Sequence, residues 1–225
     1  MYQPMLFLHW KQVRIVLIPF VVAAFALPLY AVHQMGGTGT DALQAYFVLS
    51  LAEGLRPVFP ALAAATGIML ALSAWNWDHQ IGHTYSLSLP LPRWRFATLK
   101  MGAGATLSLL PALAFWGGAQ VATASITLPA GLHAYPNALA LRFFMVMLVS
   151  YAVFFALASG TVKTASIIAS AVLLFLIVGG ALGTSLGQFF PTLHGVNLVD
   201  EAISILAGKH GPFEVFSGAW SLIDV

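Results

Sequence analysis

The chain has 225 residues, of which 60% are hydrophobic and only 7% are charged, whereas charged residues make up about 25% of a soluble domain. Nine Lys and Arg against seven Asp and Glu leave a net charge of +2, which is too small for a nucleic-acid-binding surface. The absence of cysteine excludes disulfides, thiolate metal sites and cysteine nucleophiles. The composition therefore predicts an integral membrane protein whose main partner is the lipid bilayer.

The N-terminal segment, residues 5–14, alternates aromatic and aliphatic side chains with Lys11 and Arg14 at near-helical spacing. This pattern predicts an interfacial helix, with the aromatic side chains at the acyl boundary and the cations toward the headgroups. The alternative is that the segment is the cytoplasmic start of the first span. The next apolar run continues through Pro28 and Tyr30 without a small-residue cleavage site, so we expect it to stay in the mature protein.

Five apolar runs are long enough to cross a bilayer, because a helix needs about 20 mainly apolar residues to span a hydrocarbon core of ~30 Å. None of them alternates as barrel strands do. The runs are residues 15–33, 57–77, 97–119, 138–158 and 162–183. The expected fold is an all-α polytopic helical bundle with five visible transmembrane helices in one transmembrane domain, residues 1–225.

The positions of the cations predict the orientation, because Lys and Arg are enriched in cytoplasmic loops. A cytoplasmic N-terminus places six of the nine Lys and Arg inside and three outside. The inside set is Lys11, Arg14, Arg93, Arg95, Lys100 and Lys163, and the outside set is Arg56, Arg142 and Lys209. We therefore expect the N-terminus to be cytoplasmic.

After the fifth run, residues 188–208 contain a shorter helical pattern, with Asn197 as N-cap and Gly208 as the stop. This segment is too short to cross the bilayer, and we expect it to lie at the outer face. The hydrophobicity rises again in the last ten residues, FSGAWSLIDV, as at the start of a further span.

The segment between the second and third runs, residues 78–96, is polar and interrupted by prolines, and its residues are spaced as DxxxGxTxxLxLPxxR. This spacing resembles the loop between the second and third helices of type 2 ABC transporter permeases. The sequence departs from the usual wording by inserting His83 between Gly and Thr and by adding a second proline, Pro92. The residues that carry the resemblance are Asp78, Gly82, Thr84, Leu87, Leu89, Pro90 and Arg93, followed by Lys100 in the next apolar run.

The resemblance implies that Asp78 to about Leu89 form a short coupling helix that docks in a groove on a separate ATP-binding subunit. An acid near the start of such a helix favours its dipole, and Pro90 with Pro92 would end it in a rigid turn before Arg93. The alternative is an ordinary cytoplasmic loop whose cations contact anionic lipid.

The resemblance also implies a sixth helix, a second membrane subunit in a homodimer, and a bacterial cytoplasmic (inner) membrane. The expected activity is export by alternating access, with no catalysis in this chain. No GxxxxGK[ST] motif is present, so ATP and Mg are expected on the partner ATPase subunit and no cofactor is expected here. The apolar composition favours an amphipathic or lipid-like substrate.

Glycines gather at the end of the fifth run, namely Gly179, Gly180, Gly183 and Gly187, the last two spaced as GxxxG. Such spacing permits close helix approach. Ordinary packing within one subunit explains it as well as a dimer or gate interface does. In the resembled family the fifth helix borders the dimer interface, which favours the second interpretation.

Two rival functions remain open. His79 and His83 lie four residues apart beside Asp78, so on a helix both imidazoles share a face and could bind a metal ion in an intramembrane enzyme. A third convergent ligand is not evident in the sequence. The other rival is a non-catalytic structural subunit of a larger membrane complex, in which the helices only pack and position.

Overall fold

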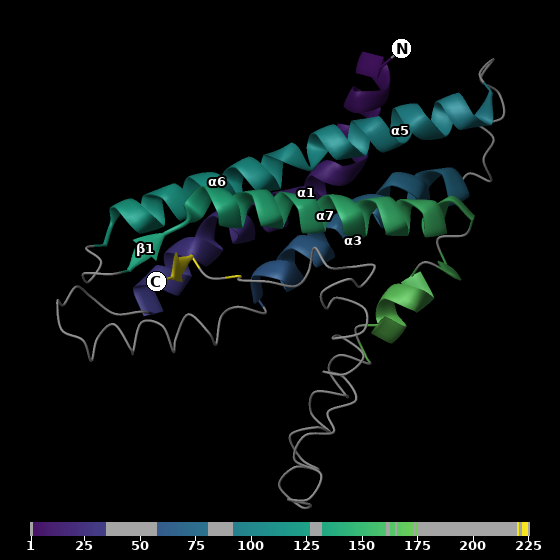
Figure 1. The fold of residues 1–225 in the computed structure, drawn as a ribbon. Helices are drawn as coiled ribbons and strands as arrows, with labels where there is room; N and C mark the ends of the chain where they lie inside the picture. Colours follow the sequence, from purple (N-terminus) through teal and green to yellow (C-terminus); the bar gives the residue numbers. More distant parts are fainter. Residues whose placement is uncertain are drawn as a thin grey trace, which may run out of the picture.

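The computed structural model describes residues 2–34, 58–80, 92–126, 132–160, 163–164, 166–172, 174, 220 and 222–224. Nearly all of these residues are helical (Figure 1). The helices are α1 (Tyr2–Gln34), α3 (Val58–Gln80), α5 (Arg93–Leu107), α6 (Leu109–Ala124) and α7 (Pro136–Gly160), and the two short strands are β1 (His133–Ala134) and β2 (Ile223–Asp224).

Within the described residues, four helical segments are long and apolar enough to cross a membrane, which confirms the predicted helical membrane character. They are Gln3–His33, Val58–Asn76, Trp94–Ala124 and Pro136–Gly160. The predicted fifth span begins with helical residues at 163–164, 166–172 and 174. Its remainder, the predicted outer-face segment 188–208 and any sixth helix lie outside the described residues, so the number of spans stays a prediction.

The first helix is much longer than a membrane core. Its 33 residues extend about 50 Å at 1.5 Å per residue, against a hydrocarbon thickness of about 30 Å. Residues 5–14 lie within α1 and continue into the first apolar run without a break. Both Lys11 and Arg14 are exposed, so the additional length can carry them into the headgroup region, and interfacial placement of residues 5–14 stays a prediction.

The helices form an antiparallel bundle in which α3 packs chiefly along α7 and α1 chiefly along α6. Helix α6 continues α5 in nearly the same direction, so the two make up the third span (Figure 1). The bundle has a strand end, where β1 and β2 pair, and an 81–91 end, where α3 ends and α5 begins. Each end has its own buried cluster.

Stacked aromatic rings fill the strand end. The rings of Phe115 on α6 and Phe143 on α7 stack with centroids 4.2 Å apart, and Phe59 on α3 meets Phe115 edge to face at 5.8 Å. The edge-to-face arrangement is one that the ring quadrupoles favour, and both pairs bury large apolar surfaces. These rings join three helices at this end of the bundle.

The C-terminal residues also pack at the strand end. His133 pairs with Asp224 and Ala134 with Ile223 in an antiparallel register, and the Tyr135 amide donates to the Leu222 carbonyl at 2.9 Å. Buried side chains accompany this pairing, namely Trp220, Leu222 and Ile223. The described part of the apolar C-terminal stretch is therefore extended and covers the bundle, and it is not the start of a helix.

Small residues allow the two main helix pairs to approach closely. A Cβ atom at Gly67 on α3 would meet the Met147 carbonyl of α7 and would lie 2.9 Å from the Tyr151 amide nitrogen. A Cβ atom at Gly118 on α6 would meet the Phe25 carbonyl of α1. Such close approach is how membrane helices gain van der Waals contact.

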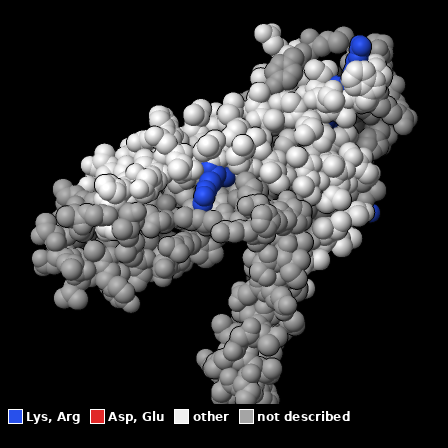
Figure 2. All heavy atoms as spheres, in the orientation of Figure 1, with Lys and Arg blue, Asp and Glu red and all other residues white. Residues whose placement is uncertain are grey.

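The outer surface of the bundle is apolar. Large side chains stand exposed along it, for example Ile15 (76%) and Val22 (61%) on α1 and Leu113 (59%) on α6. Figure 2 shows a face that is almost entirely uncharged among the described residues, with a few isolated cations. Contiguous apolar surface of this extent is typical of contact with lipid.

We predict that Gly118→Ala destabilises the protein, whereas the adjacent Gly117→Ala does not. The methyl group at position 118 would press on the Phe25 backbone, and overpacking of this kind typically costs about 1–3 kcal/mol. At Gly117 a Cβ atom would make an ordinary contact with the Phe25 ring at 4.0 Å. Thermal unfolding in detergent measures the difference, and equal melting temperatures for the two variants would contradict the close packing of α1 on α6.

Candidate functional site

The segment that carries the family resemblance connects α3 to α5. Asp78 and His79 lie in the last turn of α3, which ends at Gln80. The helix dipole therefore gives no reason for an acid at position 78, since the negative end of the dipole is nearby. The remaining predicted coupling and metal-site residues of this segment, Gly82, His83, Thr84, Leu87, Leu89 and Pro90, lie outside the described residues.

Pro92 sets the start of α5. Its backbone is extended, with φ −62° and ψ 140°, and its carbonyl accepts hydrogen bonds from the Arg95 and Phe96 amides at 2.9 and 3.2 Å. Proline suits this position because its fixed φ is compatible with a helix entry and it has no N–H group to satisfy. Arg93, the last residue of the predicted coupling motif, is accordingly the first residue of α5.

A buried cation lies close to this connection. The Nζ atom of Lys100 on α5 lies 4.4 Å from the ring centroid of Trp75 on α3 and 5.4 Å from that of Phe96 on its own helix. Lys100 and Trp75 are each only 6% exposed. Removed from water, a cation over an indole ring is stabilised by roughly 2 kcal/mol or more, which helps to offset the cost of burying the charge.

Aromatic contacts extend this arrangement to α7. Trp75 packs against Phe155 with ring centroids 5.2 Å apart, and Phe155 packs against Tyr151 at 5.5 Å. The Tyr151 hydroxyl donates to the Met101 carbonyl of α5 at 3.2 Å. The contacts thus form a closed ring through α5, α3 and α7 and back to α5; we call its members Lys100, Trp75, Phe155, Tyr151 and Met101 the polar ring.

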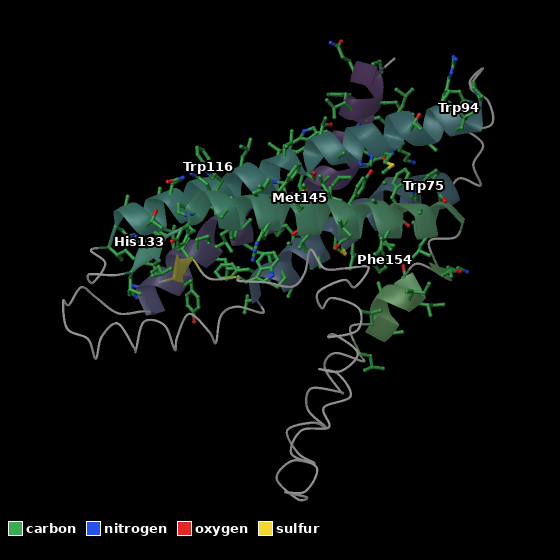
Figure 3. All side chains as sticks on the ribbon, viewed as in Figure 1. Trp75, Trp94, Trp116, His133, Met145 and Phe154 are labelled. Atoms are coloured by element: carbon green, nitrogen blue, oxygen red, sulfur yellow. The ribbon has the colours of Figure 1, made fainter. Side chains whose placement is uncertain are left out.

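Figure 3 shows where Trp75 of the polar ring lies in the bundle. Trp75 lies at the 81–91 end, on the same side of the molecule as Trp94, while Trp116 and His133 lie at the strand end. His9 on α1 is also buried, at 3% exposed. It lies one helical turn before Val13 and two before Leu17, which belong to the buried cluster that contains Trp75. A second titratable side chain is therefore buried toward the same end.

The strand end has a smaller polar cluster. The Asn137 side-chain oxygen on α7 accepts hydrogen bonds from the Trp116 indole at 2.8 Å and from the Gln120 amide at 2.9 Å, both on α6. This cluster is exposed, so we assign it a structural role in joining α6 to α7 near the membrane surface.

The other predicted site residues receive no structural support. Gly179, Gly180, Gly183 and Gly187 lie outside the described residues. In the parts of the chain that the structure describes, no three His, Cys, Asp or Glu side chains come together as metal ligands. His79 is in α3, and the metal-site hypothesis that pairs it with His83 stays untested.

Comparisons of the chain with protein-family models, with curated proteins and with solved structures found no match.

Sequence reasoning missed the polar ring. It counted Lys100 among the cytoplasmic cations, because a count of charges does not show whether a charge is buried. A signal was present: both Trp75 and Lys100 lie within one to three turns of the ends of the 81–91 connection. In two antiparallel helices joined by residues 81–91, positions a few turns from the connection lie at a similar level along the bundle axis.

We predict that Lys100 resists modification by an amine-reactive ester under conditions that modify Lys11 and Lys163. The two control lysines are exposed, whereas Lys100 is buried under Trp75. Peptide mass spectrometry of the protein in mild detergent gives the extent of modification at each site, before and after denaturation. Equal modification of all three lysines in the folded protein would show that the cation is not enclosed.

Proposed function

We propose that this chain is the membrane-spanning permease subunit of an ABC exporter, driven by a separate ATPase subunit. The observation that carries the proposal is the connection between α3 and α5. It joins two apolar helices that can span a membrane. It follows the last turn of α3, which contains the predicted acid Asp78, and it ends at the helix start at Pro92 and Arg93. A short connection held between two spanning helices can transmit a push from a docked subunit.

The distribution of charge supports a cytoplasmic location for this connection. The 81–91 end carries the described cations of α1, of α5 and of the segment after α7, and the strand end has Arg142 near the start of α7. Under the positive-inside rule this asymmetry favours the 81–91 end as the cytoplasmic one. In a bacterial inner membrane, a soluble ATPase in the cytoplasm would then reach residues 81–91.

In this proposal the chain carries out no covalent chemistry. ATP and Mg bind the partner subunit, two membrane subunits form the transporter as a homodimer, and access of a central cavity switches when the connection moves. The apolar surface of the described helices is compatible with a lipid-like or amphipathic substrate that enters from the bilayer.

We predict that a cysteine at Ser86 can be cross-linked to an ATPase, whereas a cysteine at Ser125 cannot. The chain contains no cysteine, so each variant has a single reactive site. Ser86 belongs to the proposed docking segment. Ser125 is exposed after the last residue of α6, at the strand end of the bundle. The captured protein is identified by mass spectrometry, and the proposal requires that it contain a GxxxxGK[ST] motif and hydrolyse ATP.

Absence of such a protein from the Ser86→Cys product, with the chain folded and inserted in the membrane, would reject the exporter proposal. Equal capture by Ser125→Cys would show that the cross-linking is not specific to the connection.

We also predict that the two ends of the bundle lie on opposite sides of the membrane. A membrane-impermeant maleimide should label Ser125→Cys in intact cells, and should label Trp94→Cys only after the cells are permeabilised. Both positions are exposed, so a difference in labelling reports membrane side and not burial. The reverse pattern would place the 81–91 connection outside, beyond the reach of a cytoplasmic ATPase.

A further inference from the structure

Helix α5 differs from the other helices in how it is held. It packs mainly along α1 and meets α3 and α7 at few points. Two of these points are the members of the polar ring on α5, Lys100 and Met101, which are adjacent in sequence. A further one is Gly104, one turn later, where a Cβ atom would overlap the Tyr151 ring. This stretch of α5 therefore makes specific contacts with both α3 and α7, beside the apolar contacts of Phe96 and Leu107 in the same buried cluster.

The junction between α5 and α6 lies directly after this stretch. Ser108 stands between the two helices with helical backbone angles. Its amide donates to the Gly104 carbonyl at 3.0 Å and its carbonyl accepts from the Ala112 amide at 3.4 Å, so the helical hydrogen bonds continue through it. Pro111 follows three residues later and has no N–H group, so it cannot donate to the Leu107 carbonyl as position i+4 normally does. Loss of this hydrogen bond is a common cause of helix bending. The third span thus has a weak point between the part held by the polar ring and the part packed in the strand-end cluster.

We propose that Lys100 is a positioning residue that joins α5 to α3 at Trp75, so that the two helices on either side of residues 81–91 move as one unit. In this proposal the third span bends near Pro111, where one helical hydrogen bond is missing. Without this contact, a force applied to residues 81–91 would separate α5 from α3 instead of moving the two helices together. The exporter function supplies the source of the push in this proposal, but the contact itself is a property of the isolated chain.

The charge of Lys100 is essential to this inference. A lysine stem alone would pack against Trp75 as methionine does, whereas the ammonium group selects one position over the ring face. Arginine keeps the charge and also stacks on aromatic faces. We call the contact of Lys100 with Trp75 the joint between α5 and α3. Lys100→Arg should therefore preserve the joint and Lys100→Met should lose it, although the arginine and methionine side chains are of comparable length to lysine.

The test measures distances between spin labels by pulsed electron paramagnetic resonance, on the purified full chain in lipid nanodiscs without an ATPase. One pair of labels, at Asn76 on α3 and Trp94 on α5, spans the two sides of the connection, and both positions are exposed. A reference pair at Val121 on α6 and Leu141 on α7 reports the strand end. Lys11→Met, which removes an exposed cation from α1, is the matched control variant.

We expect a narrow distance distribution for the 76 and 94 pair in the parent, Lys11→Met and Lys100→Arg proteins. Lys100→Met should lose the narrow distribution, while the 121 and 141 pair stays unchanged. Trp75→Leu, which removes the other partner of the same contact, should have the same effect and serves as the test if Lys100→Met does not fold.

Three results would overturn the proposal. The first is an unchanged distance distribution for the 76 and 94 pair in Lys100→Met, or in Trp75→Leu if Lys100→Met does not fold. The second is a broad distribution for this pair in Lys100→Arg, and the third is broadening of both label pairs together. The last would mean that Lys100 only stabilises the bundle as a whole. Because no ATPase is present, the result is independent of the cross-linking at Ser86. If cross-linking fails and Lys100→Met still frees α5, the exporter proposal falls and the joint remains.

Discussion

The fold depends on close contact between helix backbones in two pairs, α3 with α7 and α1 with α6. Each contact passes through a glycine, Gly67 in the first pair and Gly118 in the second, against a carbonyl of the facing helix. In a bilayer the hydrophobic effect does not drive helices together, because lipid tails are as apolar as the side chains. Dispersion contact and a few polar bonds must hold the bundle instead, and both need short distances between helices.

The two ends of the bundle are held in different ways. At the strand end, three phenylalanines in contact and the pairing of β1 with β2 give a dense apolar contact across several helices. At the 81–91 end, α5 packs mainly along α1, and the polar ring adds a cation–π contact with α3 and a hydrogen bond from α7. Apolar packing tolerates little displacement, whereas the proposed contact of Lys100 with Trp75 would hold α5 to α3 while the third span bends near Pro111.

The sequence predicted the features that depend on one segment alone. The four described spans follow from apolar length, since a backbone in lipid must bond within its own helix. The third span was predicted to begin at residue 97, and α5 begins four residues earlier, at Arg93. The sequence did not predict contacts between segments distant in the chain. The roles of Gly67 and Gly118 depend on carbonyls of other helices, and the pairing of His133 with Asp224 joins residues about ninety positions apart. The same limit explains why Lys100 was counted as a loop cation and not as a buried one.

The position of Lys100 also has a consequence for the energetics of the connection. A cation buried in a membrane protein is costly unless a partner remains close, so separating α5 from α3 would remove its charge from the Trp75 ring. The cost of that separation resists a spreading motion specifically, and it does not resist a movement of both helices together. In the proposed exporter, the same contact would resist spreading of α5 from α3 and would permit both helices to move together.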